Sequence, residues 1–233
     1  MLKELYKKIL NAEYIHLEKE TASYYTERKG NTLYIYFEWS NGKTDWKNNL
    51  DFPAKPYRDM QNKWYAHRGF LRVWKVIEPY LTKEICNLDV NHIVIGGYSH
   101  GAAIALLCHE YCKFNRPDAK IEGYGFGCPR VVWGFLRKSV KKRFEGFTVI
   151  RNGCDIVTRV PPVLFGFRHV GALKEIGQDA DYNPIESHYA ENYEKELTEW
   201  KPCTECKHIL SCPIDKMMFC NLKVDPCKEF EEG

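Results

Sequence analysis

The chain has 233 residues, enough for one well-packed α/β domain and too few for two full ones. Its 44% hydrophobic and 14% aromatic content is typical of a globular protein, and its net charge of +3 gives no nucleic-acid footprint. The N-terminus is charged throughout, and no stretch approaches the roughly 18 apolar residues of a transmembrane segment. We therefore expect a soluble, cytoplasmic protein, or a secreted one if a signal was trimmed from the N-terminus.

The predicted elements alternate between helices and strands along the chain. An amphipathic helix is expected over 2–12, followed by a strand over 32–37, and residues 41–66, with two prolines, indicate loop or irregular structure. A helix is expected over 69–85, where Pro79 should kink or shorten it. The remaining predictions are strands at 92–96, 120–126, 147–151 and 169–173, and helices from 102 onward, over about 131–144 and over 186–197. This alternation predicts βαβ units and a mostly parallel central sheet flanked by helices.

The pentapeptide Gly97-Tyr98-Ser99-His100-Gly101 joins the strand at 92–96 to the buried helix that follows. Gly-x-Ser-x-Gly at a strand-to-helix turn is the pattern of a nucleophile elbow, in which only glycine fits the sharp flanks. The serine hydroxyl then lies at a helix N-terminus, where free N–H groups favour developing negative charge. The alternative is a tight glycine turn with an incidental serine, so the interpretation depends on an acid and a histidine that follow.

Asp155 directly follows the strand at 147–151 and would emerge at the same sheet edge as Ser99. A turn-forming aspartate would also fit this position. Three histidines come later, and chemistry alone leaves the base open between His188, on a turn before a helix, and His169, in the expected last strand. His208 lies among cysteines.

Six groups of residues follow one another in order over 32–190: Phe37-Glu38-Trp39-Ser40 with Asp45-Trp46, His67-Arg68-Gly69-Phe70, the elbow, Gly127-Cys128-Pro129-Arg130, Asp155-Ile156-Val157, and Val160-Pro161-Pro162 with Phe167-Arg168-His169. Together they resemble the class 3, fungal-type lipases of the α/β-hydrolases. The resemblance implies an α/β-hydrolase fold with Asp155 as the triad acid and no cofactor for catalysis. It also implies that His188, within Ser187-His188-Tyr189, is the base and that His169 is a non-catalytic neighbour.

The resemblance implies Ser40 as one donor of the oxyanion hole. The second donor is expected to be the backbone N–H of His100, the residue after the nucleophile. The family carries Arg-Gly before its oxyanion residue, whereas this chain has Glu38-Trp39, so the surroundings of Ser40 depart from the pattern. Residues 41–52 follow at the place of the family's mobile cover. They are interpreted either as an amphipathic lid that opens against lipid or as an ordinary surface loop.

Five cysteines crowd into a small extension over 201–233, which we separate from a hydrolase domain over 1–200. A Cys-x-x-Cys start in a cytosolic chain favours metal binding, and a structural zinc is expected on four of them, Cys203, Cys206, Cys212 and either Cys220 or Cys227, with Cys220 preferred. An iron–sulfur cluster, disulfides in an exported protein, or free thiols are the alternatives. The resemblance does not cover this segment.

These observations predict a serine carboxylic-ester hydrolase that acts through an acyl-enzyme on acylglycerols or other lipid esters, with a lipid–water interface as its place of action. The alternative is a non-catalytic hydrolase-fold binding protein whose metal-binding cysteine tail is the working part. The ordered serine, aspartate and histidine favour the enzyme, and the altered Glu38-Trp39 pair favours the alternative.

Overall fold

The computed structural model describes residues 1–18, 22–39, 54–57, 64–178 and 182–199. Within them a seven-stranded sheet has the order β1-β2-β3-β6-β7-β9-β11. All neighbours from β3 to β11 are parallel, whereas β1 and β2 add antiparallel strands at one edge. The strands span Ile15–His16, Ser23–Lys29, Thr32–Phe37, His92–Tyr98, Lys120–Phe126, Phe147–Asn152 and Ala172–Ile176.

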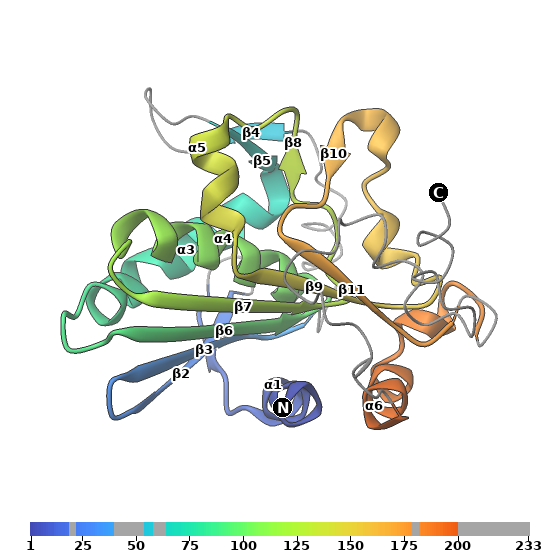
Figure 1. Cartoon of the computed structure of the whole chain (residues 1–233), viewed down its shortest axis with the longest axis horizontal. Helices are drawn as coiled ribbons and strands as arrows, with labels where there is room; N and C mark the ends of the chain where they lie inside the picture. The colour runs from blue at the N-terminus through green and yellow to red at the C-terminus, as the bar shows by residue number, and fades with distance from the viewer. Residues whose placement is uncertain (19–21, 40–53, 58–63, 179–181, 200–233) are drawn as a thin grey trace, which may run out of the picture.

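Helices cover both faces of this sheet (Figure 1). The helices α3 (Arg68–Ile85) and α4 (His100–Asn115) lie on one face, and α1 (Leu2–Asn11) and α6 (Ala190–Glu199) lie on the other. Strand β6 is central and its residues after His92 are all buried, as expected for a parallel strand covered on both sides. Each face of the sheet therefore has its own apolar cluster, the larger one under α3 and α4.

A second, four-stranded sheet lies on the α3–α4 side in the order β10-β8-β5-β4 (Figure 1). Its strands are β4 (Ala54–Tyr57), β5 (Trp64–His67), β8 (Val132–Trp133) and β10 (Phe167–Arg168). Short helices connect it to the main sheet: α5 (Lys138–Lys141), η1 (Lys142–Phe144), η2 (Val157–Arg159) and η3 (Val163–Phe165). A further short helix, η4 (Glu186–His188), lies between β11 and α6. This layer brings segments from both halves of the chain to the same end of the molecule.

Two predicted elements are wrong in type or place. The helix expected over 131–144 is a strand, a turn and a short helix, because Val132 and Trp133 pair with β5 and β10 and Gly134 adopts a left-handed φ of 75°. The last strand begins at Ala172 rather than at 169. A Cβ on Gly171 would lie 2.3 Å from the carbonyl oxygen of Phe147, which shows how closely the chain enters this strand.

Pro79 neither ends nor visibly shortens α3, which spans Arg68–Ile85. The proline lies on the exposed side of the helix, where water can hydrogen-bond the carbonyl that it leaves unpaired. Buried Trp74, Ile77 and Leu81 anchor both halves to the core. The irregular region expected over 41–66 contains β4 and β5 in its described part, and the strand β2 was not predicted.

Several predictions fall outside the described residues: Ser40, the lid or loop over 41–52, and the extension over 201–233. The division into a domain over 1–200 and a tail therefore stays a prediction. Among the helices that the structure describes, none has the length and apolarity needed to cross a bilayer.

Candidate active site

Ser99 occupies the turn between β6 and α4 with backbone angles φ 55° and ψ −119°, and it is the N-cap residue of the helix. No other non-glycine residue in the described part of the chain has a positive φ. Such a conformation costs of order 1–3 kcal/mol and persists only where the surroundings enforce it. A hydrogen bond from the Ser99 amide to the carbonyl of Phe126 (2.8 Å) ties the turn to β7.

The two elbow glycines are required by close backbone approaches. A Cβ on Gly97 would lie 2.2 Å from the carbonyl oxygen of Gly101, across the turn itself. A Cβ on Gly101 would lie 2.2 Å from the carbonyl oxygen of Phe37 at the end of β3. Any side chain at either position would push α4 away from the sheet, so the Gly-x-Ser-x-Gly spacing follows from packing as well as from the turn.

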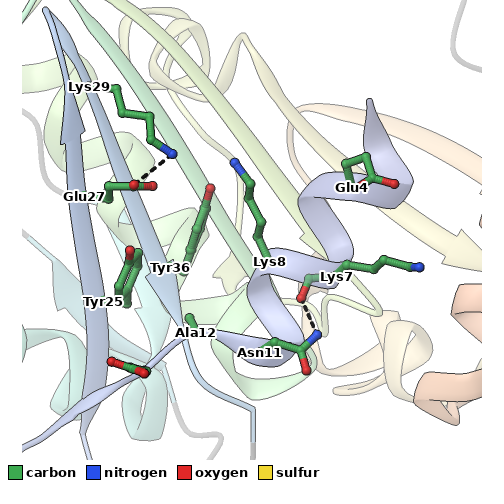
Figure 2. A pocket seen from close by; sticks show the side chains of 10 residues that line it. Glu4, Lys7, Lys8, Asn11, Ala12, Tyr25, Glu27, Lys29 and Tyr36 are labelled. Carbon is green, nitrogen blue, oxygen red and sulfur yellow. Dashed lines mark hydrogen bonds and ion pairs between the residues drawn. The ribbon is translucent and has the colours of Figure 1, made fainter.

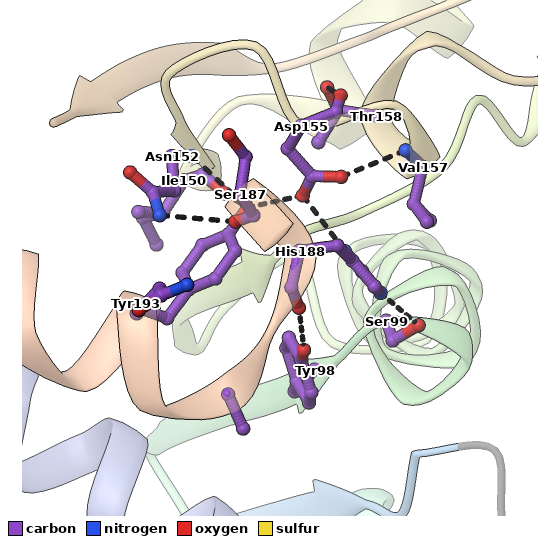
Figure 3. A network of polar contacts seen from close by, with 12 residues as sticks. Tyr98, Ser99, Ile150, Asn152, Asp155, Val157, Thr158, Ser187, His188 and Tyr193 are labelled. Carbon is purple, nitrogen blue, oxygen red and sulfur yellow. Dashed lines mark hydrogen bonds and ion pairs between the residues drawn. The ribbon is translucent and has the colours of Figure 1, made fainter. Parts of the chain in front are cut away.

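The structure brings Ser99, His188 and Asp155 together at the carboxyl edge of the sheet (Figure 3). His188 Nε2 lies 2.8 Å from Ser99 Oγ, and His188 Nδ1 lies 2.9 Å from Asp155 Oδ2. A carboxylate only accepts hydrogen bonds, so Nδ1–H donates to Asp155 and Nε2 is left to accept from the serine hydroxyl. This is the relay expected of a nucleophile, a base and an orienting acid.

Asp155 is fully buried, and each of its oxygens is hydrogen-bonded within the protein. Oδ1 accepts from the Val157 amide at 2.8 Å, and Oδ2 accepts from the Tyr193 hydroxyl at 2.6 Å as well as from His188. Burial, together with the adjacent Asp155 carboxylate, raises the pKa of Tyr193 well above its usual value. The phenol therefore stays protonated and remains a hydrogen-bond donor to the acid.

Tyr98, the residue before Ser99, packs against the turn that carries His188 (Figure 3). The Tyr98 ring stacks on the imidazole, with centroids 5.2 Å apart and planes 23° apart, and its hydroxyl donates to the backbone carbonyl of His188. Asn152 Nδ2 also donates to the carbonyl of Ser187 at 3.0 Å. The imidazole is thus fixed through its backbone and one face.

Gly127 leaves the space that the histidine and the acid occupy. Its φ is 59°, and a Cβ there would lie 2.9 Å from His188 Cε1 and 3.2 Å from Asp155 Oδ2. The Gly127 amide donates to the carbonyl of Ile150, which fixes this close approach.

His169, the other candidate base, is directed to a different partner. Its Nε2 lies 2.7 Å from the carbonyl oxygen of Thr158, in the loop after the acid. Burial lowers the pKa of His169 to about 4, so its ring stays neutral and donates to that carbonyl. His169 therefore braces the loop that follows Asp155.

His100 is the first residue of α4, where the helix leaves its first amides without intrahelical partners. Its side chain is buried, with its ring 5.4 Å from that of Phe70, so it packs inside the fold. Before the predicted oxyanion serine, the Glu38 carboxylate lies 3.3 Å from His16 Nδ1 and Trp39 packs on the α1-side cluster. Ser40 itself is outside the described residues.

No group of three or more His, Cys, Asp or Glu side chains that could hold a metal occurs in the part of the chain that the structure covers. The predicted zinc ligands Cys203, Cys206, Cys212 and Cys220 all lie beyond it. A hollow of about 460 Å³ does exist between α1 and the β2–β3 hairpin, lined by Lys7, Lys8, Tyr25, Glu27 and Tyr36 among others (Figure 2). It is on the α1 face and contains no triad residue.

Sequence reasoning missed the residues that support the triad. Tyr98 could have been found from the sequence, because it directly precedes the elbow serine. A residue at that position lies beside the histidine that approaches the serine. Tyr193 and Asn152 had none, since their contacts with the acid and the base depend on how α6 and β9 pack.

Comparisons with known proteins agree with this geometry. The family model described as Lipase (class 3) matches residues 34–165. A secreted mono- and diacylglycerol lipase of Fusarium solani is 26% identical over 129 residues, which is 54% of this chain and 38% of that protein. A lipase of Rhizomucor miehei is 27% identical over 148 residues, covering 60% of this chain and 40% of the relative. The matched part thus spans about two fifths of these curated relatives.

The solved structure of the Rhizomucor miehei triacylglyceride lipase superposes with a TM-score of 0.62. The match covers 72% of this chain and 67% of that one, at 23% sequence identity. This likeness confirms the predicted α/β-hydrolase fold with its mostly parallel sheet and flanking helices.

Proposed function

The chain belongs to the class 3 lipase family, and on that premise we propose that it is a serine carboxylic-ester hydrolase acting on lipid esters. Ser99 would be the nucleophile, His188 the general base and Asp155 the orienting acid. The observation that carries this proposal is the pair of hydrogen bonds, 2.8 Å and 2.9 Å long, that joins the three side chains in the order the reaction needs.

The reaction would begin when the Ser99 oxygen attacks the ester carbonyl and His188 Nε2 takes the hydroxyl proton. Asp155 holds the imidazole in the tautomer that can accept this proton and stabilises the imidazolium that forms. Hydrogen bonds from the Val157 amide and the Tyr193 hydroxyl keep the carboxylate oriented toward His188.

The tetrahedral intermediate carries a negative oxygen, for which we propose the backbone N–H of His100 and Ser40 as donors. The His100 amide belongs to the first turn of α4, where the helix dipole also favours negative charge. Removal of one such donor typically lowers the rate about 10²–10³-fold.

His188 would then protonate the leaving alcohol, which departs and leaves an acyl group on Ser99. Water, deprotonated by the same histidine, attacks this ester. The bond between the acyl carbon and Ser99 Oγ breaks, the carboxylic acid is released, and His188 returns the proton to Ser99, which regenerates the enzyme. Every step uses side chains and backbone groups of the chain itself, so the proposed reaction requires no cofactor.

Acylglycerols are the substrates we favour. Curated relatives are named as mono- and diacylglycerol lipases, and those names support lipid esters as the substrate class.

The test is hydrolysis of a dissolved chromogenic short-chain ester by the wild type and three variants. Ser99→Ala and His188→Ala should abolish turnover without unfolding the protein, and a serine-directed phosphonate should add once, at Ser99. His169→Ala is the control and should keep most of the activity. Loss of activity in His169→Ala but not in His188→Ala would overturn the assignment of the base.

A wild type that hydrolyses no ester and takes up no phosphonate would instead favour a non-catalytic binding protein. The observation that favours a binding protein is the Glu38-Trp39 pair in place of the family's Arg-Gly. Glu38 contacts His16 at the sheet edge, so this residue has a structural role whether or not the protein is an enzyme.

We also propose that the extension over 201–233 binds one zinc ion through Cys203, Cys206, Cys212 and Cys220. Too short to bury a core of its own, such a segment gains stability from a metal. Elemental analysis of protein purified without chelator should find one zinc per chain. Disulfide-paired thiols without metal would refute the proposal.

For location we propose the cytoplasm, in keeping with the free thiols of Cys86, Cys108, Cys112, Cys128 and Cys154. Relatives named as secreted favour export instead. Fractionation of cells that express the full-length protein distinguishes the two locations.

A further inference from the structure

Five large apolar side chains are exposed together beside the small sheet. They come from β8 and its following turn and from η3, and we call them the apolar knob: Trp133, Phe135, Val163, Leu164 and Phe165. Phe135 and Leu164 are 92% and 91% exposed, close to the maximum for any side chain. Single exposed apolar residues are ordinary, but a contiguous group of this size usually marks an interaction site.

Hydrogen bonds join the two segments that form the apolar knob. Trp133 Nε1 donates to the Phe165 carbonyl at 2.8 Å, and the Gly134 amide donates to the Gly166 carbonyl at 3.0 Å. The strands β8 and β10 pair directly below these contacts. The backbone that carries these side chains is therefore fixed, and the entropy of ordering it has already been lost on folding.

The exposed apolar surface continues from the knob to the triad. The chain runs from the acid Asp155 through exposed Ile156 and Val160 to Val163. On the other side of the site, exposed Ile185 belongs to the turn that carries the base, and the Ile156 amide hydrogen-bonds to the Pro184 carbonyl at 3.0 Å. A flat apolar partner that covers the knob would thus be brought up to the catalytic edge.

The segments that build this surface carry basic residues and no acidic ones. Residues 129–144 and 156–174, which build the knob and its flanks, contain nine of the chain's 34 Lys and Arg residues and none of its 31 Asp and Glu residues. Arg137 and Lys138 are exposed at the start of α5, two and three residues after Phe135. The Arg168 guanidinium lies over the Phe135 ring, 4.3 Å from its centroid.

We propose that the apolar knob and its basic flank form a docking surface for anionic lipid aggregates. Apolar side chains enter the acyl boundary while lysine and arginine side chains meet negative headgroups, the combination that binds interfaces. The inference deepens the proposed function, because docking here presents the triad to substrate in the same layer. A second copy of the chain fits less well, since two such surfaces face to face would bring like charges together.

The experiment measures co-sedimentation of the full chain with vesicles, using the Ser99→Ala background so that lipid is not consumed. Vesicles of pure phosphatidylcholine are compared with vesicles that contain 30 mol % phosphatidylserine. Leu164→Asp should weaken partitioning to both, by about tenfold or more. Lys138→Glu should weaken it about tenfold on the anionic vesicles only, and raised salt should have the same selective effect.

Matched controls come from the loop before β6 and the end of α3. Leu88 is 82% exposed and Lys83 is exposed on α3, so Leu88→Asp and Lys83→Glu repeat both changes away from the knob. Both controls should bind like the parent. With Ser99 intact, all four variants should hydrolyse the dissolved ester within about twofold of wild type, since none of them touches the triad.

Absence of wild-type binding to anionic vesicles would overturn the docking surface, as would equal losses in the knob and control variants. A change in oligomeric state by Leu164→Asp, with vesicle binding unaffected, would assign the knob to a second copy instead. Failure of the proposed function is seen separately, as no turnover of the dissolved ester by protein that still binds vesicles.

Discussion

Replacement of Tyr98 by phenylalanine tests how the base is held. The variant keeps the aromatic ring that stacks on His188 and removes only the hydroxyl that donates to the His188 backbone carbonyl. No buried volume is lost beyond one oxygen, and Ser99, His188 and Asp155 keep their own contacts. The change therefore isolates the restraint on the turn that carries the base.

The magnitude follows from the kind of bond. A half-buried hydrogen bond between neutral groups contributes about 0.5–1.5 kcal/mol to stability, so Tyr98→Phe should lower the free energy of unfolding by about 1 kcal/mol. In a chain of this size that corresponds to a Tm shift of roughly 2–4 °C. If the lost hydrogen bond raises the activation free energy by the same ~1 kcal/mol, kcat should fall about fivefold with KM unchanged.

The assay compares kcat and KM on a dissolved short-chain ester with Tm from thermal unfolding. Tyr14→Phe is a matched control, because the Tyr14 hydroxyl also donates to a backbone carbonyl, that of Ile9, in a half-buried position away from the triad. It should cost a similar amount of stability and leave kcat within experimental error of wild type. Unchanged kcat in Tyr98→Phe, or an equal fall in Tyr14→Phe, would refute the positioning argument.

Two further predictions concern the close packing at Gly127 and the buried, neutral histidine His109. Gly127→Ala should abolish most ester hydrolysis while the protein stays folded, because its Cβ would lie 2.9 Å from His188 Cε1; a variant with wild-type kcat would contradict the packing argument. His109 is fully buried, and burial lowers its pKa to about 3, so it stabilises the fold in its neutral form at pH values above about 6.5. That stability, on the order of 5 kcal/mol, should be lost as pH falls from 6.5 toward 3. Urea midpoints of His109→Gln should therefore depend less on pH in this window than those of the wild type.

The close arrangement of the proposed triad could be predicted because its signals are local or ordered along the chain. The elbow needs small residues at fixed spacing around Ser99, and the acid needs only to follow a strand of the same sheet. The base was different, since chemistry left His169 and His188 open and only the family resemblance favoured His188. The structure separates them by partner: Thr158 carbonyl for one, Ser99 and Asp155 for the other.

The errors fall where pairing between distant segments decides local structure. Val132 and Trp133 have neighbours that would suit a helix, yet they pair with β5 and β10, which lie far away in the sequence. Gly134 then turns the chain with a conformation that a helix does not allow. Tyr193 was missed for the same reason, because its hydroxyl meets Asp155 only after α6 has packed against β9.

The contact between Gly101 and the end of β3 also bears on which substitutions the fold tolerates. Main-chain atoms of Phe37 and Glu38, rather than their side chains, lie against Gly101 at the start of α4. The main chain where it leaves β3 is therefore positioned against the start of α4, next to Ser99, by contacts that do not involve the side chains at 38 and 39. A lineage could exchange the family's Arg-Gly for Glu38-Trp39, and use Glu38 to bind His16, without displacing the start of the segment that leads to Ser40.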